Sequence, residues 1–239
     1  MLLRIFHSSF LGKSTYICTL IQVTLRIQIN PQVASTNLRE LTTNPQNSVC
    51  FIDIIFILDS SESAKGILYD KQKEFAILLS DKLFLMKPTR AQRYDIRLAI
   101  ILKVEVVSTL QQFPTKDSLK NAVDAMQYYG EGTYTATAIS KAIDIFQMAR
   151  QGVRKVAVVI TDGQADQREP HKLEVVVRDA HAVNIEIFVI GVVQKTDPNF
   201  ENFRKEMDLI ATDPDSDHVY QIDDFMTLQG KNDVQESTS

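Results

Sequence analysis

The sequence predicts a doubly wound α/β fold, with a mostly parallel central sheet and helices on both of its faces. Three apolar runs, at 52–58, 156–161 and 185–192, have the length and composition of strands that are buried on both sides. Between these runs, apolar residues recur at helical spacing. Strands that alternate with helices imply right-handed crossovers and an open sheet.

The remaining strands are expected on either side of these runs. The stretch from Asp95 to Leu110 is rich in apolar and β-branched residues and is typical of a strand. A last short strand is expected at 218–222, and the start of a final helix at 223–228. We expect each apolar run to lie in the centre of the sheet, where helices cover both faces.

Five helices are expected, and each places its apolar residues on one face. Those residues are Leu68, Phe75, Leu78, Leu79 and Leu83; then Leu119, Val123 and Met126; then Ile139, Ala142, Ile143, Phe146 and Ala149; then Leu173, Val176, Val177 and Ala180; and finally Phe200, Phe203, Met207 and Ile210. Pro88 is expected to end the first helix, because proline cannot continue the hydrogen-bond ladder.

The totals exclude several classes of protein. The 239 residues are 44% hydrophobic and carry a formal charge of −4, with no cluster of Lys and Arg, which argues against a nucleic-acid partner. Two cysteines, Cys18 and Cys50, are too few for a disulfide-stapled mini-domain or a zinc module. The chain has no run of 18 apolar residues, so we expect no transmembrane helix and no membrane insertion.

The composition changes near residue 50. Residues 1–50 show no sustained period, and their prolines lie among polar residues as in a linker. The apolar stretches near the start leave two interpretations open, a signal sequence or a disordered segment. We therefore divide the chain into an N-terminal segment with a linker (1–50), an α/β domain (51–230) and a disordered tail (231–239).

Oxygen-bearing side chains follow the predicted strand ends. Asp59 ends the first strand and alternates with Ser61 and Ser63, so a turning loop can direct these three side chains to one point. Asp162 ends another strand, and Thr133 lies in a polar cluster that opens a helix. Ligands of open α/β sheets bind beyond the carboxyl ends of the strands, so we expect the three loops to converge there.

Three hydroxyls and two carboxylates would form an all-oxygen site. Oxygen ligands favour Mg²⁺, Mn²⁺ or Ca²⁺ over zinc or copper. Neutral hydroxyls leave much of a cation's charge uncompensated, so the cation would attract a carboxylate from a partner protein. This arrangement predicts an adhesion site and explains why a buried strand ends in a carboxylate followed by hydroxyls.

Three motifs, "DSSES" at Asp59, "GTYTAT" at Thr133 and "TDG" at Asp162, together resemble the metal-ion-dependent adhesion site of von Willebrand factor A domains. The resemblance extends from Phe51 to about Leu228, and the run at 59–83 looks closest to collagen-associated A domains of types VI and XXVIII. It implies a doubly wound, Rossmann-like sheet with one antiparallel edge strand.

The same resemblance implies how the site residues act. Ser61, Ser63 and Thr133 would ligate Mg²⁺ or Mn²⁺ directly, and Asp59 and Asp162 would act mainly through bound water. The chain would be secreted into the extracellular matrix, would not be an enzyme, and would bind matrix proteins such as collagens through an acidic ligand residue. Self-association is a further expectation. The alternative is a structural collagen-assembly module whose contacts do not depend on the metal.

Two features depart from the family pattern. The run from Leu98 to Leu110 contains no Gly, Asn or Pro, so no residue marks the turn that an antiparallel edge strand requires. Cys50 lies where relatives carry a cysteine that pairs with one after the last helix, and no cysteine follows it here. Cys50 is then either a reduced thiol or a residue whose partner lies outside this chain.

Other functional interpretations are weaker. A phosphatase with an aspartate nucleophile would typically carry a second Asp where Ser61 stands. The "GKST" at residues 12–15 lacks the glycine that a phosphate loop requires, because His7 occupies that position. Ser61 and Ser63 would also serve as plain helix caps.

The remaining polar and aromatic residues near the motifs have no assigned chemistry. The four histidines, at positions 7, 171, 181 and 218, show no metal-ligand spacing and are expected on the solvated surface. The tyrosines of the 128–134 segment either pack or form a contact surface around the metal. Asp166, Arg168 and Glu169 either tune the choice of partner or form a solvated rim, and we expect the rim.

Overall fold

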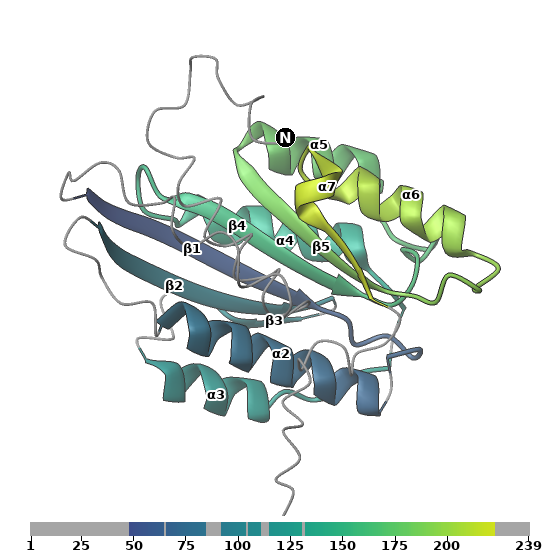
Figure 1. Cartoon of the computed structure of the whole chain (residues 1–239), viewed down its shortest axis with the longest axis horizontal. Helices are drawn as coiled ribbons and strands as arrows, with labels where there is room; N and C mark the ends of the chain where they lie inside the picture. Colours follow the sequence, from purple (N-terminus) through teal and green to yellow (C-terminus); the bar gives the residue numbers. More distant parts are fainter. Residues whose placement is uncertain are drawn as a thin grey trace, which may run out of the picture.

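A six-stranded sheet forms the centre of the molecule (Figure 1). The computed structural model describes residues 48–64, 66–84, 92–103, 105–110, 115–130 and 132–222. Its strands are β1 (Ser48–Leu58), β2 (Gln92–Leu102), β3 (Val106–Ser108), β4 (Arg154–Thr161), β5 (Ile185–Val192) and β6 (Val219–Ile222). They lie in the order β3-β2-β1-β4-β5-β6, and within the described residues β3 alone is antiparallel to its neighbour. The predicted doubly wound, mostly parallel sheet with one antiparallel edge strand is confirmed.

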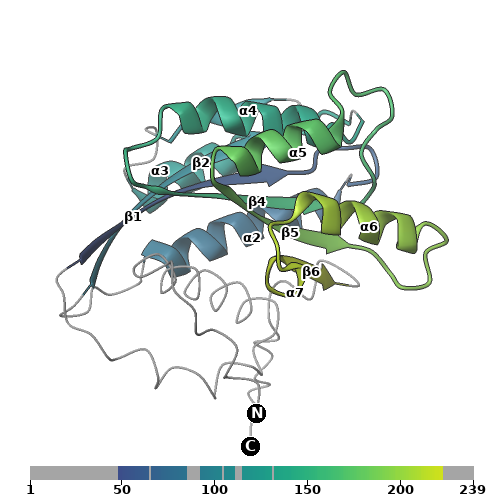
Figure 2. The same cartoon turned by 90° about the horizontal axis from the view of Figure 1, so that it is seen from above.

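Helices cover both faces of this sheet, as Figure 2 shows with the sheet seen nearly edge-on. The described helices are α2 (Ile67–Phe84), α3 (Lys116–Asp124), α4 (Thr135–Gln147), α5 (Leu173–Ala182), α6 (Phe200–Ile210) and the single turn α7 (Asp215–His218). The apolar residues of α2 and α3 belong to one core cluster, and those of α4, α5 and α6 belong to the other. The chain therefore has two hydrophobic layers with the sheet between them.

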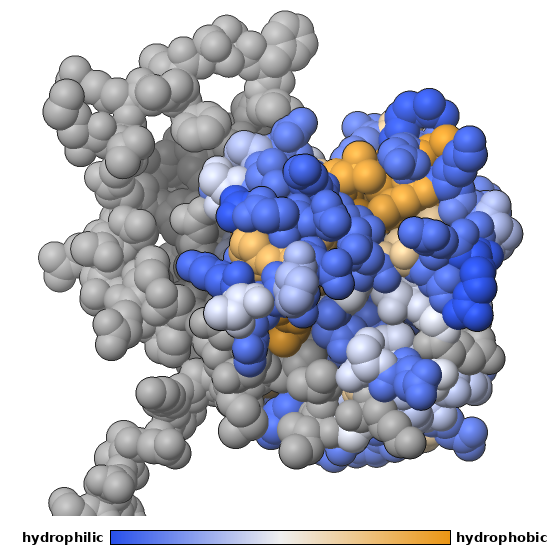
Figure 3. Space-filling model, turned by 90° about the vertical axis from the view of Figure 1, so that its right-hand side faces the viewer, coloured by the Kyte–Doolittle hydropathy of each residue, from blue (hydrophilic) through white to orange (hydrophobic). Residues whose placement is uncertain are grey.

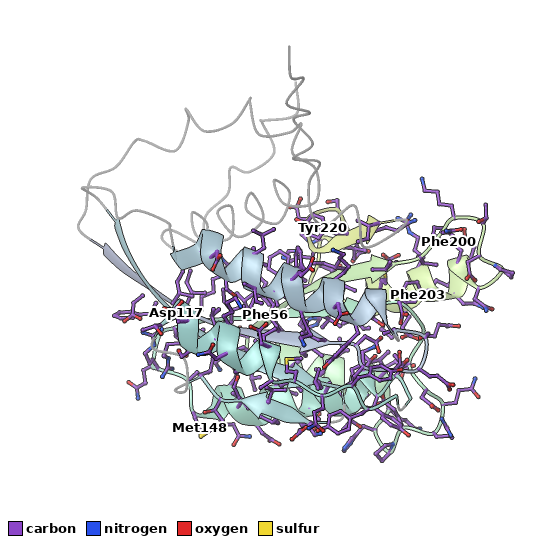
Figure 4. All side chains as sticks on the ribbon, turned by 90° about the horizontal axis from the view of Figure 1, so that it is seen from below. Phe56, Asp117, Met148, Phe200, Phe203 and Tyr220 are labelled. Atoms are coloured by element: carbon purple, nitrogen blue, oxygen red, sulfur yellow. The ribbon has the colours of Figure 1, made fainter. Side chains whose placement is uncertain are left out.

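Strand β1 explains why the apolar runs lack alternation. Ile54 and Phe56 belong to the core on the α2 and α3 side, whereas Ile55 and Ile57 belong to the core beneath α4 and α5. All four side chains are buried. In the view of Figure 4, Phe56 lies between α2 and α3, and Met148 projects from the periphery. A strand at the centre of a parallel sheet needs apolar residues on both faces, as the sequence predicted.

One carboxylate interrupts β1. Asp53 is fully buried on the α4 side and lies opposite Arg97 in the parallel register with β2. Arg97 Nε donates to Asp53 Oδ1 at 2.9 Å, and Arg150 Nη2 donates to the same oxygen at 2.7 Å. Paired with two guanidinium groups, the carboxylate is tolerated in the interior. This cluster lies toward the amino ends of the strands, opposite the predicted site.

The predicted strand at 95–110 is divided by a tight turn. Leu102 N–H donates to the Glu105 carbonyl at 2.7 Å, and Glu105 N–H donates to the Leu102 carbonyl at 3.0 Å. The expectation of one continuous strand is thus wrong, because β2 ends at Leu102 and β3 runs back beside it with a register shift between Ile100 and Ile101. The turn forms without Gly, Asn or Pro, which is why the sequence did not mark it.

Several expectations fall outside the described residues. They include the N-terminal segment as far as residue 47, with Cys18 and His7, the side chain of Cys50, the helix at 223–228 and the tail. Helix α2 ends at Phe84, and the segment containing Pro88 is also outside the description. In the part of the chain that is described, no helix is long and apolar enough to cross a membrane.

Candidate functional site

The carboxyl ends of three neighbouring strands place the first group of site residues side by side. Leu58 pairs with Leu102 across β1 and β2, and Ile57 pairs with Val159 across β1 and β4. Continuing these registers by one or two residues brings Asp59 between Lys103 and Thr161. The β1 end therefore supplies a carboxylate, the β2 end an ammonium and the β4 end a hydroxyl.

Both carboxylate oxygens of Asp59 are engaged. Oδ1 accepts from the Ser61 N–H at 2.9 Å, and Oδ2 accepts from Lys103 Nζ at 2.7 Å. The side chains of Asp59 and Lys103 are fully buried. Burial alone would raise the pKa of Asp59, but the Lys103 ammonium and the hydrogen bonds from Ser61 together hold this pKa below its ordinary value. Asp59 is accordingly a carboxylate that is ionised and fixed in orientation.

The backbone of Asp59 is held by a buried amide from α2. Gln72 Oε1 accepts from the Asp59 N–H at 2.8 Å, and Gln72 Nε2 donates to the Asp59 carbonyl at 3.1 Å. Gln72 is fully buried in the largely apolar face of α2. The strand is thus followed by a polar loop, and both backbone groups of Asp59, the first residue after the strand, remain paired.

Ser61, Ser63 and Asp162 form a continuous chain of hydrogen bonds. The hydroxyls of Ser61 and Ser63 are 2.9 Å apart, and Ser63 Oγ donates to Asp162 Oδ1 at 3.1 Å. Burial and the neighbouring Asp59 carboxylate raise the pKa of Asp162 to about 6. The surroundings of Asp162 therefore supply too little positive charge to stabilise it fully as a carboxylate.

Thr133 joins this group through a third loop. Thr133 is buried, and it lines the same cavity as Ser61 and Ser63. Its carbonyl accepts from the Asp166 N–H at 2.9 Å, which ties the loop before α4 to the loop after β4. The cavity brings Ser61, Ser63 and Thr133 together, and hydrogen bonds connect the two serines to Asp59 and Asp162.

The first loop is also tied to the segment before Thr133. Gly130 N–H donates to the Ser60 carbonyl at 3.1 Å, and Tyr128 Oη donates to the Ser61 carbonyl at 2.8 Å. The ring of Tyr128 packs edge-on against Tyr69 of α2, with centroids 5.5 Å apart. Of the two interpretations of this tyrosine segment, packing applies to Tyr128. Tyr129 remains 43% exposed.

The rim of the cavity contains charged residues with different roles. Arg168 Nε donates to Asp166 Oδ1 at 2.9 Å, and this guanidinium lowers the pKa of Asp166 to about 2. Arg168 remains largely exposed, as expected for a solvated rim. The same expectation is wrong for Glu169, because its carboxylate accepts from the N–H groups of Ala136 and Thr137 at 3.0 and 2.9 Å and so caps the start of α4.

Figure 3 looks onto the edge of the sheet where the strands end, and the described residues there are largely hydrophilic, with a few apolar areas. This polarity matches the lining of the cavity, which includes hydroxyl, carboxylate and amide side chains as well as Tyr134 and Arg168. Such a surface favours a polar or charged ligand over an apolar one.

The donor set fits a hard divalent cation. It consists of the hydroxyls of Ser61, Ser63 and Thr133 and the carboxylates of Asp59 and Asp162, and such oxygens are the ligands that Mg²⁺ and Mn²⁺ prefer. The raised pKa of Asp162 is a second indication, because a nearby cation would stabilise its ionised form. Within the described residues, no group of three or more His, Cys, Asp or Glu could hold a metal by itself. Any cation here would therefore depend on the hydroxyls.

Sequence reasoning missed two residues of this site. Gln72 falls at a position that the helical spacing places on the buried face of α2. A polar residue among the leucines and phenylalanines of that face is the signal that could have identified it. Lys103 directly follows the apolar part of β2, at a position that reads as strand interior until the turn is known. The histidine expectation is also wrong in part, because His218 is buried beside β5, although His171 is exposed as expected.

Comparison with known proteins gives the family. The family model of the von Willebrand factor type A domain matches residues 53–235. The human collagen alpha-1(VI) chain is 30% identical over 190 residues, which cover 72% of this chain and 17% of the collagen. Human matrilin-3 is 28% identical over 185 residues, covering 74% of this chain and 35% of the matrilin. Mouse integrin alpha-M is 30% identical over 191 residues, covering 77% of this chain and 16% of the integrin.

Solved structures show the same fold. Proximal thread matrix protein 1 from the mussel byssus, described with a zinc-occupied MIDAS motif, matches with a TM-score of 0.59 and 18% identity over 77% of this chain and 46% of its own. A von Willebrand factor type A protein from Catenulispora acidiphila matches with a TM-score of 0.54 and 20% identity over 75% of this chain and 40% of its own. The curated relatives named above are much longer, since the match spans between 16% and 35% of their length. Together they support an interaction module.

Proposed function

The chain belongs to the von Willebrand factor type A family, and we propose that it is a secreted adhesion module of the extracellular matrix. Its site would hold Mg²⁺ or Mn²⁺ through Asp59, Ser61, Ser63, Thr133 and Asp162. A bound divalent cation would supply an open coordination position for a carboxylate of a partner protein. The expected partners are matrix proteins such as collagens, contacted through an acidic residue.

The observation that carries this proposal is the hydrogen-bonded chain from Ser61 through Ser63 to Asp162. It links the loop after β1 to the loop after β4, although the two loops are 99 residues apart at the joining bond. Ser61 and Ser63 of the first loop line a polar cavity. Asp59 lies behind them and fixes the first loop through the Ser61 N–H.

The residues around the cavity would determine which partner is accepted. Gln164 and Arg168 line it, and Arg168 extends into solvent while it is paired with Asp166. An acidic side chain that enters the cavity would therefore meet the guanidinium on one side and the hydroxyls on the other. A basic side chain would meet the carboxylates of Glu62 and Asp166 in the lining, but it could not fill the open position of a bound cation. This arrangement favours acidic over basic ligands.

The test is a calorimetric Mg²⁺ and Mn²⁺ titration of the full chain. Asp59→Ala and Asp162→Ala should each weaken Mg²⁺ binding about 10-fold or more. Losses of this size are typical when a residue that supports the direct ligands of a metal is removed. Asp124→Ala is the control, because Asp124 is an exposed carboxylate on α3 that is paired with Lys120. If Asp162→Ala binds Mg²⁺ as the unmodified chain does, the site assignment is wrong.

A second function is favoured by one specific observation. Lys103 neutralises Asp59, so the first loop is ordered by protein groups alone. This favours a structural collagen-assembly module, including self-association, whose contacts do not need a metal. Binding to immobilised collagen in the presence and absence of EDTA separates the two functions. Binding lost in EDTA supports adhesion through the metal, and binding retained in EDTA supports assembly.

An enzymatic role is not part of the proposal. The relatives named above are a collagen chain, a matrilin and an integrin subunit, and none of these names describes an enzyme. The two carboxylates of the site are engaged with Ser61, Ser63 and Lys103, which orients them for binding rather than for proton transfer.

A further inference from the structure

Lys103 is a buried charge beside the proposed metal site that is not one of the residues proposed to hold the metal. It is fully buried at the end of β2, beside the β1 end that carries Asp59, and Thr161 lies at the β4 end on the far side of Asp59. Lys103 Nζ donates to Asp59 Oδ2 at 2.7 Å and to Thr161 Oγ1 at 2.8 Å. An ammonium is almost never fully buried unless it is paired, so these two bonds are the condition for its position.

The backbone prevents this ammonium from moving away easily. Lys103 N–H donates to the Leu58 carbonyl at 3.2 Å, and the reciprocal bonds between Leu102 and Glu105 close the turn around it. Turning the side chain outward would expose a paired carboxylate and leave the Thr161 hydroxyl without this donor. Lys103 is therefore a fixed positive charge directly behind the loop that carries Ser61.

The charge balance of the site follows from this position. Asp59 and Asp162 contribute two negative charges, and Lys103 contributes one positive charge, so a divalent cation would meet a net charge of −1 instead of −2. In an interior of low dielectric constant, a like charge near the cation weakens its binding considerably. Arg168 lies at the rim, but it is exposed and paired with Asp166, so solvent screens its contribution.

The geometry points to Lys103 as an internal cation that performs part of the metal's task. It keeps the loop from Asp59 to Ser63 assembled when no metal is bound, and it lowers the affinity of the site for divalent cations. The first half of this inference stands on the contacts of Lys103 alone, and the second half rests on the proposed metal function. Binding by this chain would then be less dependent on metal than the donor set by itself suggests.

The experiment compares the full chain with Lys103→Met, which keeps the length and apolar stem of the side chain but removes the charge. Lys155→Met is the matched control, because Lys155 lies at the amino end of β4, away from the site. Hydrogen exchange is measured for peptides that cover residues 59–64, in EDTA and in Mg²⁺. Calorimetric Mg²⁺ titrations are run on the same proteins.

In the unmodified chain and in Lys155→Met, protection of residues 59–64 should be nearly the same in EDTA and in Mg²⁺. In Lys103→Met, exchange in EDTA should be at least 10-fold faster, and Mg²⁺ should restore protection. The dissociation constant for Mg²⁺ should fall at least 10-fold relative to the unmodified chain. Unchanged protection of Lys103→Met in EDTA would overturn the anchoring role, and unchanged or weaker Mg²⁺ binding would overturn the electrostatic role.

The outcomes separate this inference from the proposed function. If neither folded protein binds Mg²⁺ or Mn²⁺, the metal function fails and the electrostatic role fails with it, whereas protection in EDTA still decides the anchoring role. If Lys103→Met does not fold, Lys103→Gln replaces it, because the amide still donates to Asp59 without a charge. Exchange in the unmodified chain that slows more than 10-fold on adding Mg²⁺ would also contradict the inference.

Discussion

The side chain of Gln72 pairs with both backbone polar groups of Asp59, its carbonyl oxygen 2.8 Å from the nitrogen and its amide nitrogen 3.1 Å from the oxygen. Gln72 belongs to α2 and Asp59 directly follows β1, so one buried amide joins a helix to the strand end that carries the candidate site. At Asp59 the Gln72 side chain takes the place of a neighbouring strand as the hydrogen-bond partner of the backbone. The chain can therefore turn away from the sheet at Asp59 without unpaired backbone groups.

Replacing Gln72 with Leu should destabilise the protein and disturb the site together. The substitution leaves a buried N–H and a buried carbonyl unpaired, and each unpaired group costs about 1–3 kcal/mol. We expect the free energy of unfolding, measured in urea, to fall by about 2 kcal/mol or more, with weaker Mg²⁺ binding. Gln147→Leu on the exposed face of α4 is the control. A loss as small as that of the control would contradict the structural role of the amide pair.

Asp162→Asn should stabilise the metal-free protein while it weakens Mg²⁺ binding. The pKa of Asp162 is raised to about 6, so near pH 7.5 the fold holds a carboxylate whose ionised form it disfavours. Removing that charge should raise the free energy of unfolding in EDTA by about 1–2 kcal/mol. The gain should shrink as the pH falls below about 6 and vanish well below 3.8, where the carboxyl group is protonated in both the folded and the unfolded chain.

The comparison in excess Mg²⁺ completes this prediction. A ligand that binds only the folded state stabilises it in proportion to the logarithm of its concentration over the dissociation constant. Mg²⁺ should therefore stabilise the unmodified chain more than Asp162→Asn. Asp144→Asn, an exposed position on α4, should show neither effect. Equal stability of Asp162→Asn and the unmodified chain in EDTA would show that neither burial nor the repulsion from Asp59 disfavours the ionised form of Asp162.

The arginine cluster at the opposite edge of the sheet should affect stability without affecting the site. Asp53→Asn removes a fully buried charge that pairs with Arg97 and Arg150. Breaking a buried ion pair costs about 3–5 kcal/mol, and the amide retains one oxygen, so we expect a loss near the lower bound. Asp95→Asn is a stringent control, because Asp95 is a half-exposed partner of the same Arg150 and should cost less than about 1 kcal/mol. Mg²⁺ affinity should be unchanged in both variants.

The central strands could be predicted because their physics is local. The apolar runs at 52–58 and 156–161 have no polar face that could be exposed to water. Each run therefore indicates a strand that helices cover on both sides. The approach of Asp59 to Asp162 also followed, because parallel strands end at the same edge. What the sequence could not give is the register, and the register alone places Lys103 beside Asp59.

The turn after β2 shows why the rest could not be predicted. Turn residues announce a hairpin when the backbone needs their special conformations, but this turn is closed by reciprocal bonds between Leu102 and Glu105 without them. Its first residue, Lys103, is selected by a contact with Asp59 that lies 44 residues away in the chain. A long-range ion pair leaves no periodic signal, so only the folded arrangement reveals it.

His218 shows the same limit at the far end of the fold, because nothing in its sequence surroundings distinguishes it from a surface residue. It is buried, its Nε2 lies 3.1 Å from Glu186 Oε1, and its Nδ1 lies 3.1 Å from the Pro214 carbonyl. Its ring also packs against Phe188, with centroids 4.7 Å apart. Nε2 and the ring thus connect α7 to β5, and Nδ1 ties the end of α7 back to the residue that precedes it.

This connection should make stability depend on pH. Burial lowers the pKa of His218, but its bonds to Glu186 and to the Pro214 carbonyl outweigh burial and raise the pKa above 6.5. A histidine that binds its proton more tightly in the folded chain adds stability below pH 6.5, and this contribution is lost as the pH rises through the raised value. We therefore expect the free energy of unfolding of the unmodified chain to exceed that of His218→Gln most below pH 6, with the difference shrinking toward pH 9. Urea unfolding across this range measures it, with the exposed His171→Gln as the control. A difference that stays constant with pH would mean that His218 acts by packing alone.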